Sequence, residues 1–285
     1  MPSQFTLAVF FVLAAEFSFT SMAVVVKMAA SHLPNESIVF FRNFFVMLFL
    51  LPWILPKTKQ TLATDIPHLH ILRSLSGLSS MYCYYYAIGN IPLSEAALLK
   101  QTAPFFIPFI TFFWFGERIY MMTAWAILLG FLGVIIILRP DVNISSIAWI
   151  GVVGSMFAAL SKSSIRRMSA TEPSIRIVFY FTAIGALVSA IPMTWAWVTP
   201  DSHALLLMFL LAVFGTIAQL CMTKGFKLAP TSQLAVFTYA SIIFATIYGW
   251  IFWHEWIDYR FFIGSVLIFT AGVLITSTNK RSVKT

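Results

Sequence analysis

The sequence is short of charged residues. Asp, Glu, Lys and Arg make up 10% of its 285 residues, and hydrophobic residues make up 60%, whereas about 25% of a typical soluble domain is charged. This shortage excludes an ordinary soluble domain and predicts a membrane protein. Cysteine is also scarce, since the two cysteines, Cys83 and Cys221, both lie in apolar stretches. Their placement predicts neither a disulfide framework nor a zinc site.

Signatures of several enzyme and nucleotide-binding classes are absent too. The five histidines fall in predicted loops and lack zinc-ligand spacing. No glycine-rich phosphate loop followed by lysine occurs, so the chain carries no ATPase motif of its own. We therefore expect no cofactor, no metal and no catalysis. The net charge of +8 would suggest a nucleic-acid partner for a soluble protein, but in a membrane protein it reflects the sidedness of the loops.

Apolar segments recur along the whole chain, and crossing a bilayer takes about 20 residues. Breaks in the apolar pattern predict an all-α integral membrane fold with ten transmembrane helices, at 5–26, 37–55, 72–88, 94–115, 121–138, 144–161, 176–198, 204–222, 231–253 and 260–278. No basic region precedes the first span and Glu16 interrupts it. We therefore interpret this span as a helix of the protein and not as a signal peptide.

Ten spans place both termini on the same side of the membrane. Lys and Arg gather on the cytoplasmic side of membrane proteins. With cytoplasmic termini, thirteen basic residues lie on or near that side. The outer half would keep five, namely Lys27, Arg42, Lys100, Arg139 and Arg260. We predict a multi-pass protein of the bacterial inner membrane with both termini in the cytoplasm, in which Lys27 and Arg42 reach the outer interface.

The two halves of the chain resemble each other. A shift of 138 residues aligns the following pairs without a gap: Gly77 and Gly215, Cys83 and Cys221, Pro92 and Pro230, Glu117 and Glu255. Each half contains five spans, an odd number, so the halves cross the membrane in opposite senses. The sequence therefore predicts an inverted repeat of five plus five helices, an architecture in which many secondary transporters place their site between the halves.

The third and fourth spans carry a family resemblance. A tyrosine-rich third span, the turn at Ile91-Pro92, Pro104 and the ending Gly116-Glu117-Arg118 resemble the drug/metabolite transporter superfamily, and more closely its EamA-type members. The resemblance implies two EamA repeats, at 1–139 and 144–278, followed by a basic cytoplasmic tail at 279–285. The start of the third span, His70-Ile71-Leu72-Arg73, is similar to that of S-adenosylmethionine uptake members. The family likeness implies a cavity built mainly by the first, third, fourth, sixth, eighth and ninth spans.

Two charged residues lie inside predicted spans and are candidates for the substrate site. Glu16 falls near the middle of the first span, where an ionised carboxylate costs roughly 3 kcal/mol unless it is paired or hydrated. It would couple transport to protons or contact the substrate; the alternative is a structural pair with Lys100. Lys100 in turn would bind a substrate carboxylate or phosphate, or else extend to the nearer interface.

Aromatic and amide side chains are expected to complete this site. Tyr82, Tyr85 and Tyr86 recur at i, i+3 and i+4 and share one helical face, while Tyr84 points elsewhere. Such a face predicts a cavity wall that stacks on a planar or cationic ligand, although interfacial tyrosines are also common. The remaining candidates for substrate contact are Gln101, Gln219 and Tyr239.

A second group is expected to gate the pathway or to support the structure. Its members are Arg73, Pro104, Pro108, Glu117, Arg118 and Glu255. The two prolines remove backbone donors from the helix that carries Lys100. Glu117 and Glu255 end the fourth and ninth spans, where the helix dipole disfavours a carboxylate. Each therefore needs a basic partner, which would be Arg118 or Arg73 for the first and Arg260 for the second.

These features predict a secondary transporter that moves a small organic metabolite, such as an amino acid or S-adenosylmethionine, by alternating access. Protons or a counter-substrate would drive it. The alternative is an integral-membrane enzyme acting on a lipid or isoprenoid substrate, which requires clustered acidic or histidine residues in a loop, whereas the ten acidic residues are scattered. Gly130, Gly133 and Gly264 predict close helix contacts. The fifth and tenth spans would then form a scaffold or the surface of a homodimer.

Overall fold

The computed structural model describes residues 4–54, 62–116, 121–138, 146–168, 171–228, 234–256 and 258–282. Regular secondary structure within these ranges is helical, without strands, which confirms the all-α class for this part of the chain. The first half contains α1 (Gln4–Ala29), α2 (Asn35–Ile54), α4 (Pro67–Asn90), α5 (Leu93–Lys100), α6 (Ala103–Phe115) and α7 (Met121–Leu138). The second half contains α8 (Ser146–Met168), α9 (Ser174–Ala190), α10 (Met193–Ala196), α11 (Ser202–Leu228), the 3-10 helix η3 (Ala235–Tyr239), α13 (Ala240–Trp253) and α14 (Tyr259–Ser282).

Each predicted span falls on one helix or on two consecutive helices. Among the described residues, five helical segments are long and apolar enough to cross a membrane, and four shorter ones are apolar. These observations support a multi-pass membrane protein, while ten crossings and the opposite orientation of the halves stay predictions. Several helix boundaries differ from the predicted spans, most of all the end of α8, which continues to Met168. The basic stretch after residue 161, which was expected in a loop, is therefore part of a helix.

Proline and glycine determine several helix ends. Pro67 occupies the first turn of α4, where its missing N–H removes no helical hydrogen bond. Gly116 ends α6 with a φ of 68°, a left-handed conformation that glycine adopts without strain. Pro104 lies in the first turn of α6, and Pro108 lies inside the same helix.

The fourth and ninth spans are both interrupted, at positions related by the predicted repeat. The fourth breaks at Gln101 and Thr102, between α5 and α6, and the ninth changes from η3 to α13 at Tyr239. Residues 101 and 239 are separated by the 138-residue shift. The Gln101 side-chain amide donates to the Thr238 carbonyl at 2.8 Å and to the Ser241 hydroxyl at 2.9 Å. The two interrupted helices are therefore joined to each other at their breaks.

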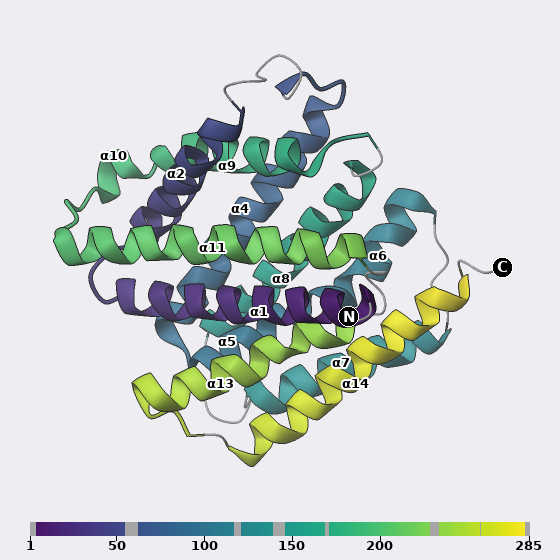
Figure 1. The fold of residues 1–285 in the computed structure, drawn as a ribbon. Helices are drawn as coiled ribbons and strands as arrows, with labels where there is room; N and C mark the ends of the chain where they lie inside the picture. The colour runs from purple at the N-terminus through teal and green to yellow at the C-terminus, as the bar shows by residue number, and fades with distance from the viewer. Residues whose placement is uncertain are drawn as a thin grey trace.

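The main helix contacts are matched when the two halves are exchanged. α1 packs mainly against α11, and α4 packs in the same way against α8. Contacts of α4 with α9 are matched by contacts of α11 with α2, while α2 pairs with α9 and α7 with α14. Figure 1 shows α1 alongside α11 and α7 alongside α14. This exchange symmetry is what two related five-helix halves require.

Large apolar side chains cover the outside of the helix bundle. Exposed examples include Phe113, Trp125, Leu187, Trp195 and Phe262. Exposure of this extent is unfavourable in water and is expected where lipid tails surround the protein. The pair α7 and α14 is held by close backbone contact, because a Cβ on Gly133 would lie 2.9 Å from the carbonyl oxygen of Gly264. These two glycines therefore allow tight helix packing, as the sequence predicts.

Cysteine labelling tests the opposite orientation of the two halves. In a variant with Cys83 and Cys221 replaced by alanine, we expect Asn90→Cys to react with a membrane-impermeant maleimide from outside intact cells. Leu228→Cys, at the repeat-related position, should react only after the membrane is opened. Labelling of both cysteines from the same side would contradict an inverted repeat.

Candidate functional site

Glu16 lies inside the helix bundle and is almost completely buried. Its exposed fraction is 4%, and its Oε2 atom has no hydrogen-bond partner. It interacts electrostatically with Lys100, at the end of α5, and with Lys162 of α8. Three helices from both halves thus bring one carboxylate and two ammonium groups into the same region. We call Glu16, Lys100 and Lys162 the central charge cluster.

Two aromatic rings lie beside Lys100 of this cluster. The Lys100 ammonium lies 5.0 Å from the centroid of the Phe19 ring and 5.3 Å from that of Tyr84. Both contacts are cation–π interactions. Lys100 is also the last residue of α5, where a positive charge is favourable for the helix dipole. The ammonium is therefore stabilised inside the protein and does not need to reach the interface.

The tyrosines of α4 diverge, in contrast to the single face expected from their spacing. Tyr84, which was expected to point elsewhere, lies in the central charge cluster. Tyr85 is buried on another side, beside Arg42. Tyr86 is exposed, and the Tyr82 hydroxyl is buried without a hydrogen-bond partner. The single-face assumption fails because α4 packs against α1, α2, α5, α8 and α9, so several of its faces are interior.

A second group of charges surrounds Phe181 of α9. The Cζ atom of Arg73 lies 4.2 Å from the centroid of this ring, and that of Arg42 lies 5.5 Å from it. Arg42 is 4% exposed and its Nη1 donates to the Asn43 side chain at 3.0 Å. The prediction that Arg42 reaches the interface is therefore wrong. The predicted partner of Arg73, Glu117, lies outside the described residues, as does Arg118.

Gly77 provides the space for this arrangement. A Cβ at this position would overlap the guanidinium of Arg73 and would lie 2.8 Å from the Phe181 ring. Arg73 precedes Gly77 by one helical turn on α4, so its side chain folds along the helix over the glycine. We call Arg42, Arg73 and Phe181 the arginine pair site.

One end of α4 is held by an ion pair between distant segments. Lys27 of α1 pairs with Glu255, and its ammonium also donates to the Ile91 carbonyl at 3.0 Å. Glu255 Oε2 accepts from the Leu93 N–H at 2.9 Å, where a carboxylate is favourable for the N-terminus of α5. The structure therefore pairs Glu255 with Lys27 and not with the predicted Arg260, while the placement of Lys27 at the outer interface stays a prediction. We call this ion pair the α1–α5 latch.

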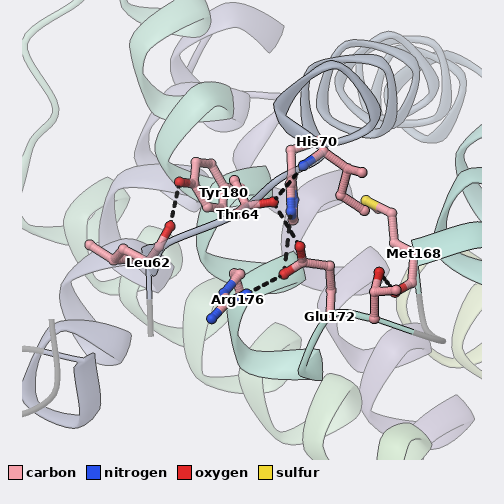
Figure 2. Close-up of polar contacts among 9 residues, drawn as sticks. Leu62, Thr64, His70, Met168, Glu172, Arg176 and Tyr180 are labelled. Atoms are coloured by element: carbon pink, nitrogen blue, oxygen red, sulfur yellow. Dashed lines mark hydrogen bonds and ion pairs between the residues drawn. The ribbon is translucent and has the colours of Figure 1, made fainter. Parts of the chain in front are cut away.

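The opposite end of α4 has its own polar cluster, shown in Figure 2. Glu172, in the connection between α8 and α9, accepts from Thr64 and from Arg176, both at 2.7 Å. His70 lies in the first turn of α4, with its Nε2 3.8 Å from Glu172 Oε2. Its ring lies over Tyr180, with 4.4 Å between the centroids. Glu172 therefore links the starts of α4 and α9.

The charges of this cluster shift two pKa values. Burial would raise the pKa of the Glu172 carboxyl, but the hydrogen bonds from Thr64 and Arg176 and the Arg176 charge outweigh it, so that this pKa lies below its usual value. Burial lowers the pKa of His70, and the neighbouring Glu172 carboxylate offsets this effect in part. The folded protein therefore favours ionised Glu172 and neutral His70.

Two of the other predicted contact residues have side-chain neighbours outside the central charge cluster. The Gln101 amide is occupied by Thr238 and Ser241. The Tyr239 hydroxyl faces α14, because a Cβ on Gly272 would overlap it. Gln219 is partly buried on α11. Gln101 and Tyr239 thus support the interrupted helices.

Among the site residues that sequence reasoning missed are Arg42, Lys162 and Tyr84. Arg42 follows the start of α2 by two turns, which is deep enough to be buried when neighbouring helices cover it. Lys162 was assigned to a loop because the end of α8 was placed too early. Tyr84 was not included because only the helical face of Tyr82, Tyr85 and Tyr86 was expected to line the cavity. A charged residue within an otherwise apolar run, as at Arg42, is the signal that could have identified the first.

Comparison with known proteins identifies relatives along almost the full chain. The profile of the EamA-like transporter family matches residues 6–139 and 145–277. The chain is 33% identical to the pseudopaline exporter CntI of Pseudomonas aeruginosa, over 93% of this chain and 94% of the exporter. It is 27% identical to an S-adenosylmethionine uptake transporter of Rickettsia conorii, over 91% and 88% of the two chains. A crystal structure with 18% identity covers 99% of this chain and 100% of its own with a TM-score of 0.67, which concerns the fold alone.

A double-mutant cycle tests the α1–α5 latch. Lys27→Gln and Glu255→Gln should each destabilise the protein and so lower its apparent unfolding temperature in detergent. The coupling between the two changes in the free energy of unfolding should be roughly 1 kcal/mol or more, because the pair is partly buried. The matched control is Arg260→Gln, whose effect should add to that of Glu255→Gln. Coupling of Glu255 to Arg260 in place of Lys27 would contradict the latch.

The polar cluster at the start of α4 predicts a pH dependence of stability. The His70 pKa is lowered on folding, so as the pH falls His70 becomes protonated in the unfolded chain at a higher pH than in the folded protein. The free energy of unfolding should therefore decrease as the pH drops below about 6.5. Glu172 should contribute only at lower pH, below about 4.3. Unfolding temperatures between pH 7.5 and 5 should depend less on pH in His70→Gln than in the control His68→Gln, an exposed histidine. Equal pH dependence in both variants would refute the assignment.

Proposed function

Because the chain belongs to the EamA-like transporter family, we propose that it is a secondary transporter that moves a small organic metabolite across the bacterial inner membrane by alternating access. The observation that carries this proposal is the central charge cluster. Glu16, Lys100 and Lys162 come from helices of both halves and interact electrostatically; Glu16 is buried in the bundle, Lys100 is half-buried and Lys162 is exposed. A buried charge inside a membrane protein is costly unless it is paired or hydrated, and such residues commonly mark a transport pathway.

The interrupted helices support the same function. Broken helices near the middle of the membrane are how many transporters expose backbone groups to a substrate. Here the break at Gln101 follows Lys100 directly, so the end of α5 would present an ammonium group to the pathway. The hydrogen bonds from Gln101 to Thr238 and Ser241 couple the two breaks. Movement of one interrupted helix would thus be transmitted to the other.

Two polar closures at opposite ends of α4 support alternating access. The α1–α5 latch involves Ile91, directly after α4, and the Glu172 cluster involves His70 in its first turn. The helical rise puts these residues about 30 Å apart, which is the thickness of the hydrocarbon core. The latch would close the outer side and the Glu172 cluster the cytoplasmic side, with both termini in the cytoplasm.

The driving force would enter through Glu16. Its carboxylate is buried among the helices and has two lysines as electrostatic neighbours, so protonation would change the charge of the cluster. Binding of a counter-substrate to the cluster would likewise change its charge. The substrate class includes amino acids and S-adenosylmethionine, for which a relative is named. The exposed apolar side chains would contact lipid or, along α7 and α14, a second copy of the chain.

Counterflow in proteoliposomes tests this proposal. Preloaded unlabelled substrate should accelerate entry of labelled S-adenosylmethionine or of labelled amino acids, which a carrier allows and an enzyme does not. Glu16→Gln should reduce the initial rate at least about tenfold, because it removes the acidic group of the cluster. Glu36→Gln, which changes a carboxylate at the start of α2, is the matched control and should transport normally. Unchanged counterflow in Glu16→Gln at equal protein abundance would exclude this role of Glu16.

A further inference from the structure

The arginine pair site contains two guanidinium groups without an acidic partner. Arg42 and Arg73 contact the same ring, that of Phe181. No carboxylate of the described part of the chain forms an ion pair with either arginine. The Nε atom of each is buried and has no hydrogen-bond partner. Two positive charges held together inside a membrane protein repel each other and lose hydration, so the arrangement is unfavourable unless an anion joins it.

The contacts with Phe181 do not satisfy the arginines. A cation–π contact involves the face of a guanidinium, whereas its N–H donors lie in the plane of the group and point past the ring. Arg42 directs one donor to Asn43 and lies beside Tyr85, which leaves its Nε unpaired. The plane of a guanidinium matches an oxyanion, with which it forms two parallel hydrogen bonds.

The surrounding charges add to this imbalance. Arg42, Arg73, Lys100 and Lys162 lie on α4 or on helices packed against it, and Glu16 is the acidic neighbour of the two lysines. The arginine pair site and the central charge cluster are connected through Tyr84 and Tyr85 of α4, which interact with Glu16 and Arg42 respectively. A substrate that spans both groups would meet a positive field.

We infer that the transported metabolite is an anion, and that Arg42 and Arg73 bind its carboxylate or phosphate group. This assignment rests on the proposed transport function and specifies its substrate class. It disfavours net cations such as S-adenosylmethionine as substrates, even though a relative carries that name. Gly77 is part of the site, because any larger residue would displace the Arg73 guanidinium.

Thermal stabilisation of the purified full-length protein tests the site. Citrate, inorganic phosphate and short-chain dihexanoyl phosphatidylglycerol serve as probes in a neutral detergent, at constant ionic strength set with chloride. A ligand that binds the folded state raises the apparent unfolding temperature in a saturable way. We expect citrate or phosphate to do so, and we expect Arg42→Gln and Arg73→Gln to raise the half-saturating concentration about tenfold or more. Arg167→Gln, at an exposed arginine over Trp114, is the matched control and should bind normally.

Conservative variants cover the case in which loss of charge prevents folding. Arg42→Lys and Arg73→Lys keep the charge but lose the planar fork, and should weaken the response to citrate or phosphate several-fold. The proposal is overturned if no anion stabilises the protein, or if all variants respond as Arg167→Gln does. It is also overturned if phosphatidylglycerol alone acts through the two arginines, since the site would then hold a lipid.

Counterflow separates this inference from the transport proposal. Exchange of labelled S-adenosylmethionine without any effect of citrate or phosphate on stability would leave the carrier function intact and refute the anion site. Citrate binding that depends on Arg42 and Arg73, without counterflow of citrate or any other probe, would support the anion site and refute the carrier function.

Discussion

Charge inside a membrane protein has to be compensated, and this constraint determines how the helices around α4 are arranged. Glu16, Arg42, Arg73, Lys100 and Lys162 come from five helices, which are α4 and four helices that pack against it. None of the five could face lipid without a large loss of hydration free energy. The exterior is covered by apolar side chains, which can face lipid without this loss.

The composition of α4 follows from its central position. Its sequence contains Ser74, Ser76, Gly77, Ser79 and a run of tyrosines, and it is not among the segments apolar enough to be recognised as a membrane span. A helix that packs against five others needs only a narrow apolar surface toward lipid, and Ile71 and Leu75 are exposed apolar side chains of α4. Small residues such as Gly77 allow close approach of neighbouring side chains, and the Ser74 and Ser76 hydroxyl groups donate to backbone carbonyls. Ser76, for example, donates to the Leu72 carbonyl at 2.7 Å.

Hydrophobic periodicity and turn chemistry predicted most of the helices, because bilayer thickness and the helical rise fix the length of each span. The repeat shift of 138 residues relates Gln101 to Tyr239, but the helix breaks at these two positions were not predicted. Side-chain partners were harder to predict. The pairing of Glu255 with Lys27 joins residues 228 positions apart, and nothing local favours it over the nearby Arg260. The positive φ of His254, 52°, turns Glu255 back toward α1 and α5, a change of direction that composition does not reveal.

The tyrosines of α4 show that burial is also difficult to predict from sequence within a single helix. Spacing along a sequence establishes which residues share a face, but not which faces are covered by neighbours. Tyr86 has the spacing of an interior residue and is exposed, while Tyr84 has the wrong spacing and lies beside Lys100. Burial on several faces is expected for a helix that packs against five others. The rule of one interior face holds for helices at the edge of a bundle and fails for its centre.

The different strengths of the contacts bear on how the protein would move. α1 with α11 and α4 with α8 form the most extensive packing, and each pair joins the two halves. The closures at the ends of α4 are smaller, and the α1–α5 latch retains some exposure, with 12% and 14% for its two side chains. Ion pairs in contact with water contribute little to stability, so they exchange partners at a lower cost than packed helices separate. Opening at either end would therefore begin at these polar closures, and the extensive helix pairs would move as units around the charges at the centre.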